Sequence, residues 1–325
     1  MILPLRSLFK KVFARKSAAT SCSLDTPIVI SRDGHTVSRK QISSNALKVL
    51  YRLRESGYEA YLVGGCVRDL LLGREPKDFD VATNAEPEQV HALFRGAILI
   101  GRRFRLVHVR FYREIIEVAT FRQGGFVVDE DARINEHGML MRDNQFGSIA
   151  EDVIRRDFTV NALYYNIADF SVIDFVGGMQ DLKAGVLRII GEPLTRFRED
   201  PVRILRAIRF AAKLGFRIES ATEEAIPATA NLLAHVAPAR LFDEVLKLLS
   251  GGCGAVTFSL LRQYNLLTYL FPLTEQVLQD VNLHQEVDRF LLTMLRNSDD
   301  RIAENKGVNP AFMLAAMLWY PRQQH

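Results

Sequence analysis

The sequence is poor in cysteine, with only Cys22, Cys66 and Cys253, which lie far apart and form no CxxC pair. A scattered and odd-numbered set of this kind predicts neither a disulfide framework nor a zinc site, and it favours a reducing cytoplasm as the compartment. No apolar run reaches the roughly 18 residues that a membrane span needs, so no membrane-spanning segment is expected. Internal repeats and low-complexity tracts are also missing.

A strong charge of one sign is missing as well, since 42 Lys and Arg stand against 38 Asp and Glu and leave a net charge of +4. The distribution of charge is therefore more informative than its total. Residues 1–16 carry five basic side chains, and no acid precedes Asp25. Apolar residues recur there at helical spacing, which fits an amphipathic surface helix or a transit-like peptide. The interpretation that we favour is a loosely ordered basic tail.

What the sequence does contain is a series of strands followed by a series of helices. A helix capped by Ser43 or Ser44 and ended by Gly57 is predicted first. Strands are then expected at 59–65, 78–83, 97–101, 106–112 and 114–121, with short helices at 66–73 and 87–94 and one last strand within 171–182. Beyond Gly191 every long segment has helical periodicity. This order predicts an α+β fold: a mixed-sheet first domain and an all-helical second part.

Two aspartates, Asp78 and Asp80, follow the first predicted short helix with one residue between them. Alternate residues of a strand project from one face, so we expect both carboxylates to point one way, with Phe79 buried between them. Two like charges held together are unfavourable unless a cation joins them, and Mg²⁺ prefers such oxygen ligands. The alternative is an ordinary solvated edge strand.

A glycine pair, Gly64-Gly65, lies where the preceding strand passes into the short helix. Glycine lets a ligand approach the backbone closely, and a helix N-terminus attracts phosphate. Arg68 adds a cationic donor in the first turn. A tight structural turn with a surface arginine is the alternative, but a phosphate site followed by a metal-binding pair suits nucleotidyl transfer with a pyrophosphate leaving group.

Four motifs occur in order: "LVGGCVRDLLLG…KDFDVAT", "EVATFR", "RRDFTVNALYYN" and "REDPVRILRAIRFAAKLGF". Together they resemble the template-independent nucleotidyltransferases that include bacterial poly(A) polymerases and CCA-adding enzymes. Residues 99–111, "LIGRRFRLVHVRF", and the flanking "SRKQISSNALKVLYRL" and "VNPAFMLAAMLWYP" are similar to the poly(A) polymerase subgroup. The resemblance extends from about Ser38 to Tyr320.

The resemblance implies an enzyme that adds AMP from ATP to RNA 3′ ends, with two Mg²⁺ ions held by Asp78 and Asp80 and no covalent intermediate. It also implies that Arg156 and Asp157 contact the nucleotide sugar and phosphates. Asp157 is then the preferred third active-site acid, and Glu117 on a neighbouring predicted strand is its rival. From the sequence alone, Asp157 could equally cap the following helix.

A later helix is predicted to begin with Asp200 as its N-cap and Pro201 in its first turn. Asp200 and Arg203 then lie on one face, either as a surface ion pair or, as the resemblance implies, as the groups that read the incoming base. Such a pair matches adenine and cytosine alike, so pocket shape or rigidity has to separate them. The resemblance assigns Arg206 and Arg209 to triphosphate binding; a solvated basic stripe is the alternative.

Residues 99–113 contain five arginines with aromatic residues between them. Arginine neutralises phosphate and aromatic rings stack on bases, so Arg102, Arg103 and Arg105 are candidate RNA contacts. An amphipathic strand pair with its aromatics in the core would give the same pattern. His108 is interpreted as a packed strand residue.

The resemblance implies a nucleotidyltransferase (polymerase-β-like) head at 45–185 after a basic segment at 1–44. A helical neck at 186–250 and a helical body at 251–325 follow, and a monomer is expected. Cys66 stands where the family often has glycine or alanine, and the family continues past "WYPRQQH", so the body is expected to be truncated. Two rival functions stay open: a CCA-adding enzyme and a non-catalytic nucleotide- or RNA-binding remnant.

Overall fold

The computed structural model describes residues 26–101, 105–123 and 145–324. Its head contains an eight-stranded sheet in the order β1-β8-β7-β2-β3-β6-β5-β4. The strands are β1 (Ile28–Ile30), β2 (Ala60–Val63), β3 (Asp80–Thr83), β4 (Ala97–Ile100), β5 (Leu106–Phe111), β6 (Glu114–Thr120), β7 (Leu163–Asn166) and β8 (Val172–Asp174). The helices of the head are α1 (Ser44–Glu55), α2 (Gly65–Leu71), α3 (Pro87–Leu93), α4 (Ile149–Arg155) and α5 (Gly178–Ala184).

Helix α1 forms where the sequence predicts it. The Ser43 hydroxyl accepts hydrogen bonds from the backbone N–H groups of Asn45 and Ala46, which caps the helix and contributes about 1 kcal/mol. Its buried residues, Ala46, Val49, Leu50 and Leu53, pack with those of β5 and β6 in the main core. The sheet begins earlier than the head boundary that we predicted at residue 45, because β1 pairs with β8.

The sheet is mixed: β3 pairs antiparallel with β2 and parallel with β6. Asp80 is the first residue of β3 and lies opposite Val63 on one side and Glu117 on the other. Asp78 precedes the strand, in a bend. The prediction of a strand from residue 78 is therefore wrong at its start, and the alternation of a regular strand applies to Asp80 but does not extend to Asp78.

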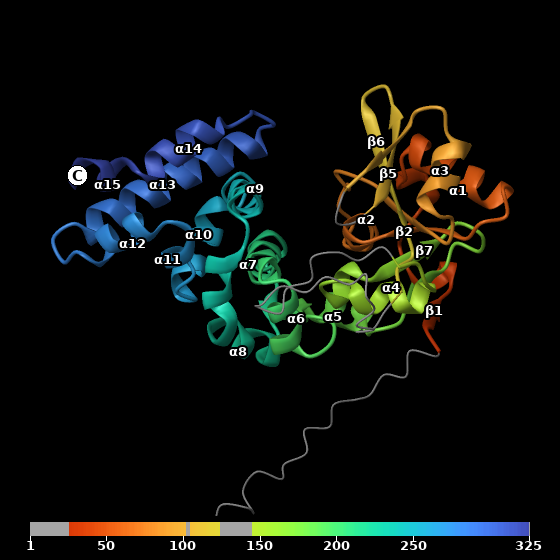
Figure 1. The fold of residues 1–325 in the computed structure, drawn as a ribbon, viewed down its shortest axis with the longest axis horizontal. Helices are drawn as coiled ribbons and strands as arrows, with labels where there is room; N and C mark the ends of the chain where they lie inside the picture. The colour runs from red at the N-terminus through yellow and green to blue at the C-terminus, as the bar shows by residue number, and fades with distance from the viewer. Residues whose placement is uncertain (1–25, 102–104, 124–144, 325) are drawn as a thin grey trace, which may run out of the picture.

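One face of the strands β3 to β6 forms the core of the head. Val81, Val107, Val109, Ile116 and Val118 are almost completely buried in one cluster with residues of α1 and α3. Figure 1 shows α1 and α3 on the outer side of β5 and β6, away from the helical part of the molecule. The opposite face of these strands therefore turns toward the helices that follow.

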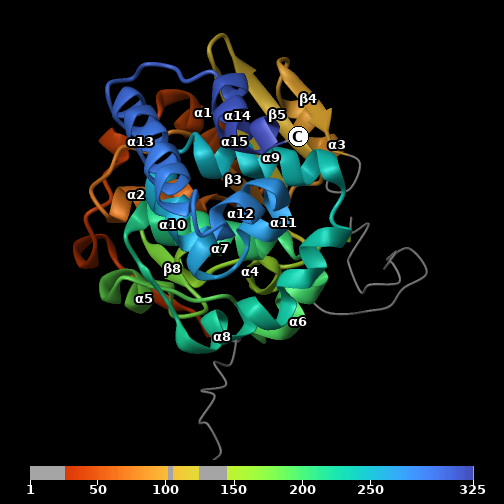
Figure 2. The same cartoon turned by 90° about the vertical axis from the view of Figure 1, so that its left-hand side faces the viewer.

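The rest of the chain is mostly helical, and the prediction of an all-helical second part is wrong only for a short parallel pair of strands, β9 (Val186–Leu187) and β10 (Arg217–Ile218). Its helices are α6 (Pro193–Glu199), α7 (Val202–Leu214), α8 (Ser220–Thr229), α9 (Pro238–Leu249), α10 (Gly254–Gln263), α11 (Leu267–Leu270), α12 (Pro272–Gln279), α13 (His284–Ala303), α14 (Pro310–Met317) and α15 (Trp319–Gln324). Together with the head they form a crescent, and Figure 2 looks along it with the helical part in front. Across the described ranges, none of the helices is long and apolar enough to cross a membrane.

Candidate active site

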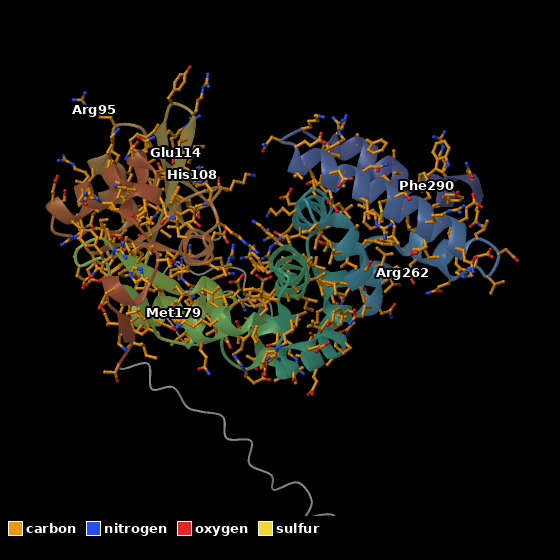
Figure 3. The ribbon with its side chains drawn as sticks, turned by 180° about the vertical axis from the view of Figure 1, so that it is seen from behind. Arg95, His108, Glu114, Met179, Arg262 and Phe290 are labelled. Atoms are coloured by element: carbon orange, nitrogen blue, oxygen red, sulfur yellow. The ribbon has the colours of Figure 1, made fainter. Side chains whose placement is uncertain are left out.

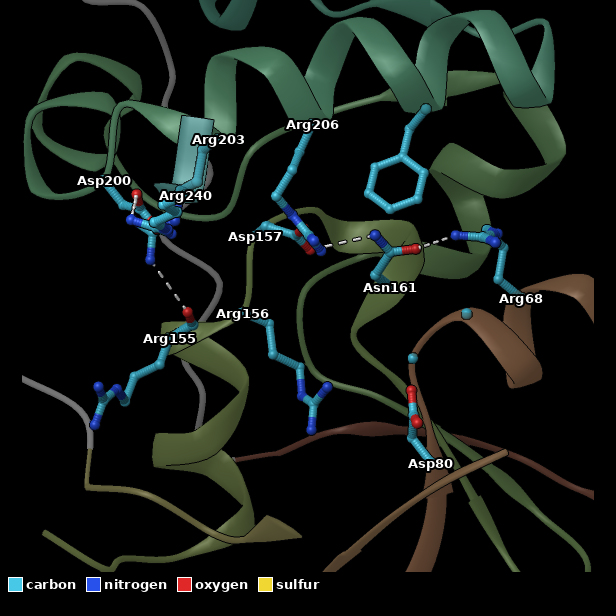
Figure 4. Close-up of a pocket in the computed structure, with 13 residues that line it drawn as sticks. Arg68, Asp80, Arg155, Arg156, Asp157, Asn161, Asp200, Arg203, Arg206 and Arg240 are labelled. Carbon is cyan, nitrogen blue, oxygen red and sulfur yellow. Dashed lines mark hydrogen bonds and ion pairs between the residues drawn. The ribbon is translucent and has the colours of Figure 1, made fainter. Parts of the chain in front are cut away.

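A cavity of about 420 Å³ lies where the head meets α7 and α9. Its walls combine the turn before α2, the start of β3, the segment after α4 and the N-terminal half of α7 (Figure 4). The lining residues are Gly64, Gly65, Arg68, Asp80, Arg155, Arg156, Asp157, Asn161, Asp200, Arg203, Arg206, Phe210 and Arg240. Six of these are arginines and three are aspartates, so the cavity is suited to an anionic ligand.

The glycine turn brings the backbone close to Asp80. Gly64 has φ +83° and ψ −138°, a conformation that side chains with a Cβ rarely adopt. A Cβ at this position would lie 3.8 Å from an Asp80 carboxylate oxygen and 3.9 Å from an Arg156 guanidinium nitrogen. Cys66 does not narrow the turn, because its buried thiol points inward and donates to the carbonyl of Val63 at 3.2 Å.

The Asp80 carboxyl group has a raised pKa. Burial raises its pKa to about 6, the nearby carboxylates of Glu117 and Asp78 add to the rise, and Arg156 opposes it. Three acids of the described chain are thus within electrostatic reach of one another. They do not form a closed cage, because no group of three or more histidine, cysteine or acidic side chains converges tightly enough for a metal within the described ranges.

The pKa of Asp157 is lowered, whereas that of Asp80 is raised. Burial alone would raise its pKa, but Arg206 and hydrogen bonds from Arg206, the Phe158 N–H and Asn161 outweigh burial and lower the pKa to about 2. Arg206 Nε donates to Asp157 Oδ2 at 2.7 Å and its Nη2 lies 2.5 Å from the same oxygen. Asp157 is therefore a permanently charged anchor for Arg206, 49 residues further along the chain.

A hydrogen-bonded chain continues from Asp157 to the glycine turn (Figure 4). Asn161 donates from Nδ2 to Asp157 Oδ1 at 3.2 Å, and its amide oxygen accepts from Arg68 Nη1 at 2.5 Å. Arg68 is 2 % exposed and also donates to Asp69 Oδ1 through Nε and Nη2, at 2.8 and 2.7 Å. Arg68 thus lines the cavity, but its guanidinium is held inside the fold by these partners.

Arg156 is fixed by a second buried network. Its Nη2 donates to Asp152 Oδ2 at 2.9 Å, and its Nε donates to the Tyr164 hydroxyl at 2.7 Å. The Tyr164 hydroxyl in turn donates to Asp152 at 2.6 Å. Burial would lower the pKa of Arg156, but Tyr164 and Asp152 raise it, so the side chain presents a fixed positive charge beside Asp80.

Asp200 does not cap α7, contrary to our prediction. The helix begins at Val202, and the Asp200 carboxylate instead accepts two parallel hydrogen bonds from Arg240 on α9, at 2.7 and 2.6 Å. Arg203 donates to Glu199 at 2.9 Å. The two charge-assisted hydrogen bonds from the Arg240 guanidinium occupy both oxygens of the Asp200 carboxylate.

The neck is tied to the head through backbone carbonyls. Arg196 on α6 donates to the carbonyls of Arg155 and Arg156 at 3.0 and 2.9 Å, and Arg203 donates to the Arg155 carbonyl at 3.5 Å. Both side chains are about nine-tenths buried. The segment that carries Asp157 therefore has a fixed position relative to α6 and α7.

Some predicted residues lie outside this arrangement. Arg209 does not line the cavity; its guanidinium lies 4.7 Å from the centre of the Phe210 ring. Arg105 forms an ion pair with Glu88 in the head. Arg102 and Arg103 fall outside the described residues.

Sequence reasoning missed Arg155, Asn161, Phe210 and Arg240. Asn161 had a signal, since it lies four residues after Asp157 within the quoted motif. Arg240 had none, because "ARLFDEVLKLL" has the periodicity of a packed helix.

Comparisons with known proteins show which family the chain is related to. Residues 60–188 match the family model described as "Poly A polymerase head domain", and residues 215–278 match "Probable RNA and SrmB- binding site of polymerase A". The chain is 54% identical to Poly(A) polymerase I of Salmonella typhi over 99% of its own length and 70% of the relative. The chain belongs to the poly(A) polymerase family.

More distant relatives of the poly(A) polymerase family are CCA-adding enzymes. The one from Geobacillus thermodenitrificans is 42% identical over 71% of this chain and 55% of the relative. Among solved structures, the Bacillus stearothermophilus CCA-adding enzyme in complex with CTP matches with a TM-score of 0.60 and 36% identity, covering 77% of this chain and 56% of that one. The prediction of a nucleotidyltransferase head with a helical remainder is confirmed.

Proposed function

We propose that this chain transfers AMP from ATP to the 3′-hydroxyl of RNA without a template and releases pyrophosphate. The observation that carries the proposal is the cavity itself, in which one carboxylate of raised pKa, Asp80, faces a wall of fixed guanidinium groups. The identity of 54% to a Poly(A) polymerase I supports the choice of reaction.

The acids around Asp80 fit a divalent cation of the Mg²⁺ type. Mg²⁺ is commonly held by one or two carboxylates together with substrate phosphates and water, so a closed protein cage is not needed. Asp78 and Asp80 are the proposed ligands. Their carboxylates repel each other, and a bound cation would compensate both negative charges. When bound, two such ions activate the attacking hydroxyl and stabilise the leaving pyrophosphate.

The choice of a third acid, which the sequence left open, now favours Glu117. Glu117 lies directly opposite Asp80 in the register of β3 and β6 and helps to raise its pKa. The negative charge of Asp157 is already compensated by its ion pair with Arg206. We propose that Asp157 acts as a positioning residue, which holds Arg206 and Asn161 where they can receive the nucleotide phosphates and sugar.

Base selection is proposed for the end of the cavity formed by Asp200, Arg203 and Arg240. An exocyclic amine can donate to a carboxylate, and a neighbouring ring nitrogen can accept from a guanidinium. Arg240 holds both oxygens of Asp200 by hydrogen bonds, which keeps the carboxylate in one orientation. A fixed orientation favours a base of one size, which is how adenine can be separated from cytosine.

The test is incubation with a short RNA, Mg²⁺ and each nucleoside triphosphate in turn. We expect extension with ATP alone, and loss of at least a thousandfold in rate on Asp80→Ala, because a metal ligand supplies several kcal/mol of transition-state stabilisation. Asp300→Ala, an exposed position on α13, is the matched control. Extension by a few residues only when CTP and ATP are both supplied would indicate the CCA-adding alternative. Binding of RNA without any extension would indicate the non-catalytic one.

A further inference from the structure

The strands β4, β5 and β6 have a second face, which none of the core residues occupies. The register places Asp80, Glu117, His108 and Ile98 side by side across four neighbouring strands. Arg110 and Ile115 form the next pair along on the same face. We call this surface of Ile98, His108, Arg110, Ile115 and Glu117 the open face.

The open face is not covered by the helices that bury the other side. Ile98 is 42% exposed and Ile115 is 47% exposed, and Arg110 is exposed beside them. His108, which we expected to be packed, has its side chain 28% exposed, 3.6 Å from Glu117. The open face therefore combines two exposed apolar side chains with an exposed guanidinium group, that of Arg110, beside the acids of the cavity. Figure 3 shows the side chains of this part of the head, with His108 labelled.

The tip of the β5–β6 hairpin supports the same conclusion. Phe111 pairs with Glu114, so Tyr112 and Arg113 form a two-residue turn. Tyr112 has φ +41° at the first turn position, where glycine is strongly favoured in hairpins. The ring is 98% exposed, and the Arg113 guanidinium lies 5.4 Å from its centre. A tyrosine at this position strains the backbone of the turn and its ring is not buried, so the residue does not stabilise the fold. This indicates that the Tyr112 ring serves to contact a ligand.

The open face begins beside Asp80 and leads away from the nucleotide cavity. The nucleotide cavity approaches Asp80 from the side of Gly64, Arg156 and α7, whereas the open face extends from Asp80 in the other direction, across β6, β5 and β4. From Asp80 to Ile98 there are three strand spacings of about 4.8 Å, or roughly 14 Å. Roughly four stacked nucleotides at about 3.4 Å each would span this length.

The geometry points to the open face, flanked by Tyr112 at the tip of the β5–β6 hairpin, as the surface that binds the last few nucleotides of the RNA and delivers the 3′-hydroxyl to Asp80. Isoleucine side chains and the Tyr112 ring contact bases, while Arg110 and Arg113 neutralise phosphates. This inference rests on the proposed function, because it takes a single RNA strand as the partner.

The first test changes the charge of the surface without touching the cavity. Ile98→Glu on the edge strand β4 is compared with Ile28→Glu on the opposite edge strand β1, where the isoleucine is 63% exposed. Affinity for a short RNA with a 3′-deoxy end is measured by fluorescence anisotropy, so that no catalysis is needed. We expect Ile98→Glu to weaken RNA binding at least fivefold and Ile28→Glu to leave it within twofold, with the Kd for ATP unchanged in both.

The second test uses Tyr112→Gly, which suits the backbone of the turn and removes the ring. We expect unchanged or increased thermal stability together with an RNA Kd raised by roughly five- to a hundredfold, as for the loss of one base–aromatic stack. Unchanged RNA affinity in Ile98→Glu and Tyr112→Gly, in a wild-type protein that extends RNA, would overturn the inference and leave the proposed function intact. Loss of stability with unchanged RNA affinity would show that the open face packs against protein. RNA binding without extension by the wild type would instead contradict the proposed function.

Discussion

Replacing Asp80 by asparagine should stabilise the metal-free protein while it abolishes transfer. In the folded chain the pKa of Asp80 rises from 3.8 to about 6, chiefly through burial and then through Glu117. The folded protein therefore binds this proton more tightly than the unfolded chain does. The free energy of unfolding falls as the pH rises from about 4 to about 6, and it stays lower above that range.

The size of the effect follows from the shift. About two pKa units at 1.36 kcal/mol each correspond to about 3 kcal/mol, and the partial exposure of Asp80 reduces the expected gain to about 1–3 kcal/mol. Asparagine keeps the shape of the side chain and removes the charge. Asp80→Asn should therefore exceed wild type in unfolding free energy by this amount at pH 8, and by much less at pH 4.5.

Urea denaturation in EDTA at the two pH values measures this difference. Asp300→Asn is the matched control, because Asp300 is exposed on α13 and a surface substitution changes stability by about 0.5 kcal/mol or less. Addition of Mg²⁺ should stabilise wild type more than Asp80→Asn, since a ligand stabilises the state that binds it. An Asp80→Asn protein no more stable than wild type at pH 8, or a difference that does not depend on pH, would refute the reasoning.

Three further outcomes are expected. Arg206→Met leaves Asp157 buried without its partner and should lower the unfolding free energy by about 3 kcal/mol in urea denaturation, and a loss below 1 kcal/mol would argue against the anchor. Gly64→Ala forces a side chain into a conformation with positive φ beside Asp80, so it should cost about 1–2 kcal/mol and reduce AMP transfer, whereas full activity would show that the close approach is unimportant. Arg240→Gln frees the carboxylate of Asp200 and should reduce the preference for ATP over CTP in kcat/KM by about tenfold, and an unchanged preference would remove Arg240 from base selection.

The fold was predictable because its signals are local. Helix α1 has its cap and apolar face within twelve residues, and the strands of the head each carry their own pattern of apolar side chains. A strand ending in Gly64-Gly65 and followed by a helix was recognisable for the same reason. The start of β3 was not predictable from the sequence. Polar and apolar residues alternate from Asp78 to Val81 as they would in a strand, although the backbone bends at Asp78 and β3 begins only at Asp80.

The partners of the site residues were less predictable because they come from distant parts of the chain. Spacing placed Asp200 and Arg203 on one face, either as an ion pair or as the groups that read the base, and it gave no sign of Arg240, forty residues later, whose guanidinium donates twice to Asp200. Arg206 reaches back 49 residues to Asp157. Periodicity describes which face of a helix is buried and carries no information on which distant charge that face meets.

The attachment of Arg196 and Arg203 to the carbonyls of Arg155 and Arg156 bears on how nucleotides are exchanged. If the neck swung away from the head, these three hydrogen bonds would be exchanged for hydrogen bonds to water, at about 0.5–1.5 kcal/mol each, and two largely buried guanidinium groups would be exposed. Such a movement would cost free energy in every catalytic cycle. We therefore expect pyrophosphate to leave and the next ATP to enter through the existing opening of the cavity, with α6 and α7 staying attached to the head between successive additions.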